Sequence, residues 1–216
     1  MASDPWEILT RRDIDFAELD QLQSQCVDSI RQNPERAYLL VSEPKPTFTH
    51  GRFANREDLL WSDDEVEQRG LAIRAASRGG KWTYHGPGQI VIYPLIQVRR
   101  LGYERRAVFS FMNDLRSSVQ RGLTSMGIAA ELRDRPFGIY VGERKVASFG
   151  MALHGGISSN GVAIYAQNQS DPFVGIHACG VANEKLTSLW EEGFRQDWEI
   201  AAQILTDHVK KGFKSP

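Results

Sequence analysis

The sequence predicts an α+β fold in which helices flank a mixed or antiparallel β-sheet. Short apolar runs closed by Gly, Pro or Asn fill the middle of the chain, and amphipathic segments of helical period lie before, within and after them. The regular strand–helix alternation of a parallel α/β sheet is missing. The 216 residues suit one globular domain, and no repeat or linker marks a boundary. We therefore expect a single domain over residues 1–216.

Three helices are predicted where apolar residues recur every three or four positions. Each has a residue that can begin or end it, such as an aspartate before the first turn or a glycine after the last. The predicted helices are 13–32 with Asp13 as N-cap, 108–126 followed by Gly127, and 198–209 followed by Gly212.

Strands are predicted for apolar runs bounded by turn-forming residues. The first two of these runs, 38–41 and 47–49, are expected to be neighbours because only a Pro-Lys-Pro turn separates them. The other predicted strands are 71–75, 89–96, 129–133, 138–141, 146–153 and 161–166.

Composition and charge exclude several classes of protein. The 26 Lys and Arg residues nearly balance 27 Asp and Glu residues, so no global charge favours nucleic acid or an anionic membrane as partner. The longest apolar run, 90–96, contains a proline and is too short to span a bilayer. The first twenty residues are rich in charge and show no secretory signal, so we expect a cytoplasmic protein.

Common cofactor motifs are absent from the sequence. Gly80-Lys81 lacks the preceding glycine and the following hydroxyl of a P-loop, and Gly86-Pro-Gly88 lacks the third glycine of a dinucleotide fingerprint. The five histidines do not occur at i, i+4 spacing, and no Cys-x-x-Cys pair is present. We therefore expect no cofactor and no metal.

The segment 78–89 is the first that carries chemistry. It combines Arg78, Lys81 and His85 with two glycine clusters between predicted strands. Glycines let a backbone approach a ligand closely, and the three side chains supply fixed or switchable charge. The alternative is a long hairpin loop whose Arg and Lys side chains are simply exposed.

Cys179 is the second candidate, because it precedes a glycine in a segment that is predicted to be a loop. Only the thiolate is a good nucleophile, and a free thiol with a pKa near 8.5 needs a cation or base to activate it. Lys145 is the candidate cation. At about 4 Å and an effective dielectric near 20, it would favour the thiolate by up to about 4 kcal/mol. Cys26 falls on the apolar stripe of the first helix and is predicted to be a core residue. Without further information, Cys179 could equally well be a structural residue.

These residues resemble the lipoyl(octanoyl) transferase family of the lipoate pathway. Residues 78–89 with Tyr93-Pro-Leu95 look like the family's signature block, and 145–150 resembles its lysine segment. Residues 173–180, followed by Thr187-Ser-Leu189, are similar to its nucleophile segment. The resemblance extends from about Glu43 to Leu189.

The resemblance implies the fold of biotin and lipoate ligases, which is related to that of class II synthetases. It also implies a dyad of Cys179 and Lys145 that takes an octanoyl group from octanoyl-acyl carrier protein and passes it to a lysine of a lipoyl domain. The acceptors it implies are 2-oxoacid dehydrogenase E2 subunits and the glycine cleavage H protein. We expect a monomer, since nothing in the sequence demands more.

By the same resemblance, three segments form the acyl and carbonyl site, with backbone N–H groups as an oxyanion hole. These residues are Arg78, Gly79, Gly80, Lys81, Trp82, Thr83, Tyr84, His85, Ser148, Phe149, Gly150, Gly161, Val162 and Ala163.

Three positions depart from the family pattern. Asn160 stands where a histidine usually precedes Gly161, Ala178 replaces a proline before the nucleophile, and His177 replaces an apolar residue. Asn cannot carry a proton at neutral pH, so any proton transfer by the usual histidine is lost or moved here, and His177 is one candidate to take it over.

Three other functions remain open. A ligase of the same fold would adenylate lipoate or biotin with ATP, although that chemistry needs no thiol. An amidotransferase would move octanoyl between lipoyl-bearing proteins. A non-enzymatic binding module would hold acyl carrier protein or lipoyl domains without turnover.

Overall fold

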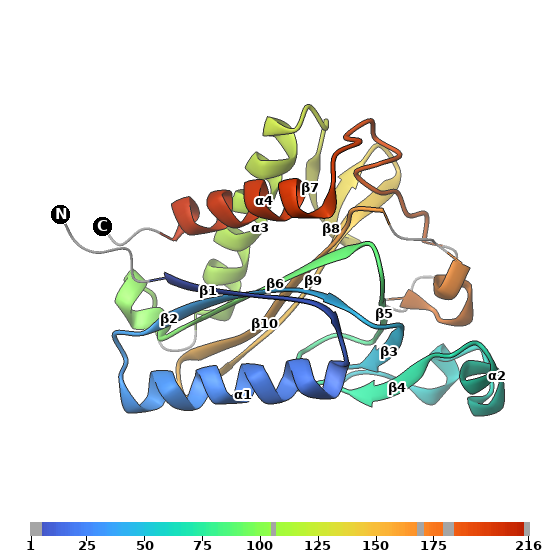
Figure 1. Ribbon diagram of the computed structural model, residues 1–216, viewed down its shortest axis with the longest axis horizontal. Helices are drawn as coiled ribbons and strands as arrows, with labels where there is room; N and C mark the ends of the chain where they lie inside the picture. Colours follow the sequence, from blue (N-terminus) through green and yellow to red (C-terminus); the bar gives the residue numbers. More distant parts are fainter. Residues whose placement is uncertain (1–5, 105–106, 168–170, 179–183, 214–216) are drawn as a thin grey trace.

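The computed structural model describes residues 6–104, 107–167, 171–178 and 184–213, which form an α+β fold with two sheets (Figure 1). The predicted fold class is confirmed. In chain order, with η for 3₁₀-helices, the elements are β1 (Trp6–Ile14), α1 (Phe16–Gln32), β2 (Ala37–Pro44), β3 (Thr47–His50), η1 (Arg56–Asp58), α2 (Asp63–Gln68), β4 (Ala72–Ala75), β5 (Trp82–His85), β6 (Gln89–Ile96), η2 (Val98–Leu101), α3 (Val108–Ser125), β7 (Glu131–Asp134), β8 (Phe137–Val141), β9 (Arg144–His154), β10 (Ile157–Tyr165), η3 (Asp171–Gly175) and α4 (Trp198–Gly212).

The larger sheet has seven strands in the order β1-β2-β6-β10-β9-β8-β7. β1 and β2 are parallel, whereas the other neighbours pair antiparallel, so the sheet is mixed. The smaller sheet has the order β4-β3-β5, with β3 parallel to β4 and antiparallel to β5.

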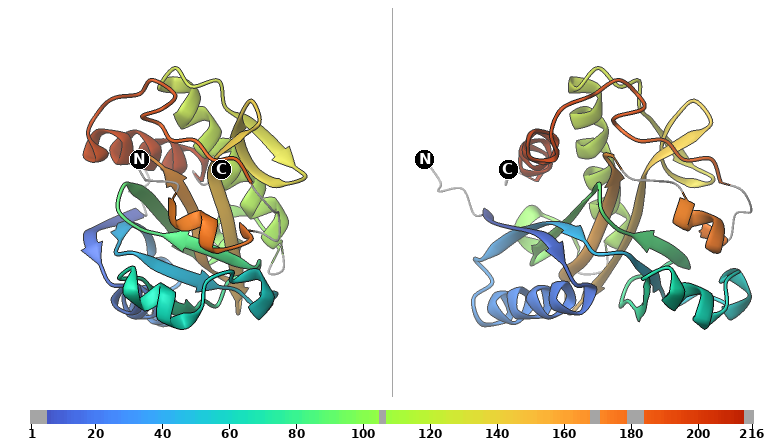
Figure 2. Two further views of the ribbon diagram at one scale, coloured as in Figure 1. Left: turned by 90° about the vertical axis from the view of Figure 1, so that its right-hand side faces the viewer. Right: turned by 45° about the vertical axis from the view of Figure 1, so that its right-hand side comes forward.

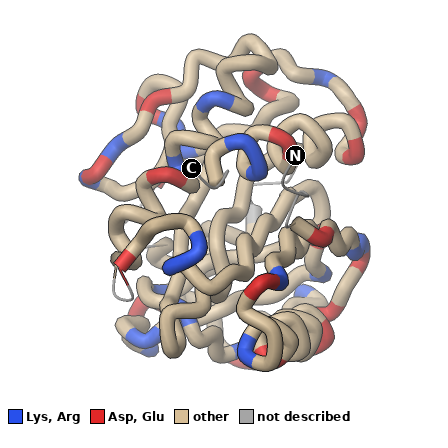
Figure 3. Tube along the Cα trace, turned by 90° about the vertical axis from the view of Figure 1, so that its left-hand side faces the viewer, with Lys and Arg blue, Asp and Glu red and all other residues tan. Residues whose placement is uncertain are grey.

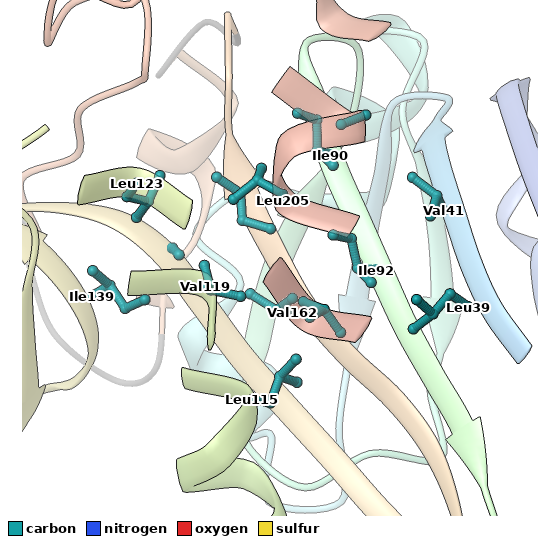
Figure 4. Close-up of a cluster of buried hydrophobic side chains, with 14 of the residues drawn as sticks. Leu39, Val41, Ile90, Ile92, Leu115, Val119, Leu123, Ile139, Val162 and Leu205 are labelled. Atoms are coloured by element: carbon teal, nitrogen blue, oxygen red, sulfur yellow. The ribbon is translucent and has the colours of Figure 1, made fainter. Parts of the chain in front are cut away.

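Helices cover both faces of the larger sheet. α1 packs on one face, with Leu19 and Ile30 in a core that includes Leu40, whereas α3 and α4 pack on the other, with Leu115 and Leu205 against Leu39 and Val41 (Figures 1 and 4). Successive residues of a strand point to opposite faces. This is why every residue of the central strands β2 and β6 is buried and neither shows an alternating pattern.

The smaller sheet has its own core, in which Phe48, Trp82 and Tyr84 pack with Val66 of α2. Figure 2 shows this sheet and α2 beside α1, beneath the long strands β9 and β10. The same face of the larger sheet therefore carries α1 and the smaller sheet, and the region between them is where the candidate site forms.

The two later helices agree with prediction, and the first begins later than expected. α3 ends at Ser125 with Gly127 at φ 84°, and α4 extends to Gly212. α1 begins at Phe16, and its N-cap is Asp15 rather than Asp13. Asp13 has φ 52° and lies at an irregularity of β1, because residues 6–14 pair with β2 as an edge strand that the sequence did not predict.

The predicted strands exist, with boundaries shifted by a few residues, but two expectations about them are wrong. β2 and β3 belong to different sheets, so they are not paired neighbours. Residues 82–85, expected to be loop, form β5. The short helix α2 was also missed, although Ser62 and Glu65 form a capping box that is visible as Ser-x-x-Glu.

The near balance of positive and negative residues in the sequence is visible on the surface of the folded chain. On the face drawn in Figure 3, Lys and Arg are interspersed with Asp and Glu. Within the described ranges, no helix is both long and apolar enough to cross a bilayer.

Candidate functional site

A cavity of about 50 Å³ opens between the two sheets. The larger sheet contributes residues of β6, β9 and β10, and the smaller sheet contributes β5 and the loop before it. α1 adjoins the cavity, since Phe16 stacks on His85 with ring centroids 5.8 Å apart.

Most residues of the three predicted segments meet at this cavity. The lining residues among them are Arg78, Gly80, Lys81, Trp82, Thr83, His85, Ser148, Phe149, Gly150, Gly161, Val162 and Ala163. Gly79 and Tyr84 do not line it. Tyr84 instead packs edge-on against Phe48 and Phe173 in the core of the smaller sheet.

Sequence reasoning missed three lining residues, Val91, Tyr93 and Asn160. The strand that holds Val91 and Tyr93 was predicted, but because it is apolar throughout, no alternation indicated which residues face the cavity. Asn160 was noted only as a departure from the family pattern. Because Asn160 lines the cavity, this departure changes the chemistry of the cavity wall.

The Arg78 guanidinium is buried and binds the protein itself. It donates hydrogen bonds to the carbonyl and Oγ1 of Thr49, at 3.0 and 2.8 Å, and to the carbonyl of Lys81 at 2.9 Å. Arg78 therefore ties the glycine loop to β3 and fixes one wall of the cavity. The alternative of an exposed arginine on a hairpin loop is wrong.

His85 is neutral. Burial, together with the positive charge of Arg78, lowers its pKa to about 3. Gln89 donates its Nε2 to the carbonyl of Tyr84 at 3.0 Å, so its Oε1 faces His85 Nδ1 at 3.2 Å and Nδ1 carries the proton. The unprotonated nitrogen is then Nε2, an acceptor. The expectation that His85 supplies switchable charge near neutral pH is wrong, because desolvation outweighs its hydrogen bond.

Asn160 links the cavity wall to α1. Its backbone N–H donates to Gln23 Oε1 at 2.6 Å, and its Nδ2 donates to Ser77 Oγ at 3.3 Å. Its φ of 58° is in the left-handed region, which asparagine tolerates better than most residues. The next residue, Gly161, has no room for a side chain, since a Cβ there would lie 2.2 Å from the carbonyl oxygen of Ile92.

Lys81 lies beside the segment that leads to Cys179. Its Nζ donates to Asp58 Oδ2 at 3.2 Å, and the Asp58 carbonyl accepts from the backbone N–H of His177 at 2.8 Å. His177 Nδ1 is 3.9 Å from Asp58 Oδ1. Asp58 was not predicted, and no sequence motif marks it.

Lys145 is fully buried near the start of β9 and does not line the cavity. Its Nζ forms an ion pair with Glu184 Oε1, which also accepts a hydrogen bond from Tyr140 Oη at 2.7 Å. Cys179 lies outside the described residues, so its distance to Lys145 is not part of the structure.

Comparison with known proteins identifies the family. Residues 15–213 match the model of the lipoyl protein ligase A/B catalytic domain. The chain belongs to this family. Within it, an octanoyltransferase of Solibacter usitatus is 32% identical over 200 residues, which are 93% of this chain and 89% of that protein. An octanoyltransferase of Alkalilimnicola ehrlichii is 38% identical over 169 residues, 78% of this chain and 74% of that protein. The chain is therefore an enzyme of the octanoyltransferase group in the lipoyl protein ligase A/B family.

Solved structures of lipoyl protein ligase A/B proteins and biotin ligases share the fold. A lipoate-protein ligase A bound with ATP matches with a TM-score of 0.75 and 15% identity, over 98% of this chain and 87% of that one. The biotin protein ligase of Aquifex aeolicus matches with a TM-score of 0.52 and 12% identity, over 96% of this chain and 68% of that one. At these identities the likeness shows the fold alone, and it confirms the biotin and lipoate ligase-like fold.

Cys26, the second of the two cysteines in this chain, is a core residue as predicted. Its side chain is buried on the face of α1 that packs against the larger sheet. Burial raises its thiol pKa to about 11, which leaves little thiolate at neutral pH. Among the residues that the structure describes, no three His, Cys, Asp or Glu side chains gather as a metal site.

Proposed function

We propose that the chain moves an octanoyl group from octanoyl-acyl carrier protein, through a thioester on Cys179, to the ε-amine of a lipoyl-domain lysine. The proposed acceptors are 2-oxoacid dehydrogenase E2 subunits and the glycine cleavage H protein. The observation that carries the proposal is the single cavity on which three separate segments converge, in a chain whose relatives are octanoyltransferases.

The cavity suits an acyl chain. Val91 and Ala163, which belong to the core on the α1 side of the larger sheet, give it apolar walls, and burial of methylene groups there is favourable by about 0.8 kcal/mol each. The neutral His85 and the amide of Asn160 are among the polar lining groups that an octanoyl carbonyl or an incoming amine can meet. In this proposal the residues of 78–85 other than Gly79 and Tyr84, together with 148–150 and 161–163, form the acyl and carbonyl site.

The nucleophile and its cation are proposed as Cys179 and Lys145. Ala178, which immediately precedes Cys179, and Glu184, which is ion-paired with Lys145, line the same surface hollow. This supports the pairing, because Glu184, which follows segment 179–183, contacts the lysine, and Ala178, which precedes the segment, lines the same hollow as Glu184.

The reaction then has two balanced steps. The Cys179 thiolate attacks the thioester carbonyl, the bond to the carrier sulfur breaks, and the carrier thiolate takes a proton from the Lys145 ammonium. The acceptor amine next attacks the acyl-enzyme, an amide forms, the Cys179 sulfur leaves as thiolate, and Lys145 recovers its proton from the amine. Thioester exchange is nearly balanced in energy, so this route needs no nucleotide.

Intact-mass measurement with octanoyl-acyl carrier protein tests the proposal. We expect a hydroxylamine-labile octanoyl adduct on the wild type, none on Cys179→Ala, and a much slower one on Lys145→Ala. An adduct that survives Cys179→Ala contradicts the dyad. Acylation that requires ATP favours the ligase, and octanoyl taken from an already modified lipoyl domain favours the amidotransferase. Tight binding of donor without any adduct favours the binding module.

A further inference from the structure

Glu184 is a buried carboxylate that contacts the lysine of the proposed dyad. The Lys145 side chain is 0% exposed and that of Glu184 is 6% exposed, so water screens this ion pair little. The same oxygen, Oε1, pairs with Lys145 Nζ and accepts the hydrogen bond of Tyr140 Oη at 2.7 Å. The ion pair and the hydrogen bond therefore converge on one carboxylate oxygen.

The backbone holds these three residues in register. The Lys145 N–H donates to the Lys185 carbonyl at 2.8 Å, and the Thr187 N–H donates to the Lys145 carbonyl at 2.9 Å, so the chain after Glu184 pairs with β9. Tyr140 pairs with Lys145 across β8 and β9, beside a register irregularity. Gly138 leaves room for the lysine stem, because a Cβ there would lie 2.9 Å from Lys145 Cε.

Other charged groups near the pair are already engaged. Glu192 pairs with Arg144 at 2.6 Å and accepts from Thr187 Oγ1 at 2.5 Å. Arg133 lies over the Tyr140 ring at 4.8 Å and pairs with Glu143 at 2.9 Å, while Lys145 Nζ is 5.3 Å from the same ring centroid. In the part of the chain that the structure describes, Glu184 is the acidic side chain that forms an ion pair with Lys145.

A buried ammonium without its counter-charge is strongly disfavoured, and such a group loses its proton instead. A neutral amine at position 145 could neither stabilise a thiolate nor donate a proton to a leaving thiol. Removal of the Glu184 carboxylate would therefore leave the buried Lys145 ammonium without its counter-charge.

We propose that Glu184 is a positioning residue of the acyl-transfer site, whose carboxylate keeps Lys145 as an ammonium and, together with Tyr140, fixes its orientation. This inference rests on the proposed function and extends the Cys179–Lys145 dyad to a third residue. Glu184 also places a negative charge near the nucleophile segment, which opposes a thiolate. Loss of the Lys145 ammonium has the larger effect on the thiolate, because this side chain is fully buried and water cannot take the place of its charge.

The test is the pH dependence of Cys179 alkylation by iodoacetamide, followed by peptide mass spectrometry so that Cys26 is counted separately. For Glu184→Gln we expect the midpoint of the pH–rate profile to rise by about one pH unit and the rate at pH 7 to fall about tenfold. Glu184→Asp keeps the charge and is expected to restore most of the rate. Glu143→Gln removes an exposed carboxylate from the neighbouring Arg133 pair and is the matched control, with an unchanged midpoint.

An unchanged or faster alkylation of Glu184→Gln overturns the inference, since Glu184 would then be neutral or a competitor for Lys145. If Glu184→Gln does not fold, Tyr140→Phe decides, because it keeps both charges and removes only the hydrogen bond. We expect a smaller fall in rate at pH 7 for this variant, and a wild-type profile overturns the inference. Failure of the proposed function is distinct, because the wild type itself would then form no octanoyl adduct on Cys179.

Discussion

Asn160 combines two constraints at one position, a left-handed backbone and a place in the cavity wall. The backbone conformation therefore restricts which side chains can stand beside Gly161, and it accounts for the tolerance of an asparagine here. The sequence showed that Asn160 departs from the family pattern, but only the structure showed that its backbone has a positive φ.

We predict that Asn160→Ala is less stable than Asn160→Gly by about 1 kcal/mol, because alanine pays for a positive φ and glycine does not. In ordinary helices and strands the order is reversed. Urea unfolding of the two variants measures the difference. Both variants lack the Ser77 hydrogen bond, so equal stabilities would show that backbone strain at this position does not matter.

His85 predicts a pH dependence of stability. Its pKa is about 3 in the folded state, below its usual value of 6.5, so the unfolded chain binds more protons between these values. Stability is therefore fully present above about pH 6.5 and is lost as the pH falls towards 3, by at most about 1.4 kcal/mol per pH unit. Urea unfolding at several pH values should show a shallower loss for His85→Gln. Parallel curves for wild type and variant would contradict this assignment.

At the scale of elements, α1 connects the core to the site. Its apolar stripe packs on the larger sheet through Leu19, Cys26 and Ile30, while Phe16 and Gln23 contact the cavity residues His85 and Asn160. The helical period predicted the stripe, and the structure agrees. The polar contact could not be predicted, since Gln23 lies far from Asn160 in the sequence.

Shortening a fully buried side chain of α1 should lower the free energy of unfolding much more than shortening a partly buried one. We expect Leu19→Ala, at a fully buried position, to lower the free energy of unfolding by about 2–5 kcal/mol. Leu22→Ala, at a partly buried position on the same helix, is the matched control and should cost clearly less. Chemical denaturation of both variants checks this, and similar losses would mean that the stripe is not the main contact of α1.

At the scale of the whole molecule, the cavity exists because the smaller sheet and α1 lie side by side on one face of the larger sheet. α3 and α4 lie on the opposite face and contribute no lining residue among those described. The layer of α3 and α4 thus packs on the sheet away from the cavity, and the cavity lies in the opposite layer, beside α1 and the smaller sheet.

Acylation should therefore protect one side of the molecule selectively. Under the proposed function, incubation with octanoyl-acyl carrier protein is expected to slow amide hydrogen exchange in 78–85, 148–150 and 160–163 and to leave α3 and α4 unchanged. Cys179→Ala, treated identically, should show no lasting protection after the donor is removed. Protection centred on α3 and α4 would place the acyl group elsewhere.

The sequence alone determined the local features of this protein. Helical and strand periodicity located α3, α4 and most strands, because side-chain type and spacing are properties of neighbouring residues. The resemblance of the signature segments to a known family indicated most of the residues that line the cavity. It failed where long-range pairing decides the outcome. β1 and β5 form because distant strands offer their hydrogen-bonding edges, and β2 and β3 enter different sheets for the same reason.

Only the tertiary structure decided the electrostatics of the site. The neutral state of His85, the commitment of Arg78 to backbone carbonyls and the pairing of Lys145 with Glu184 all depend on burial and on partners that the chain brings together by folding. The free energy of a charge is set by its three-dimensional surroundings, so residue type names the candidates and the fold determines what each of them can do.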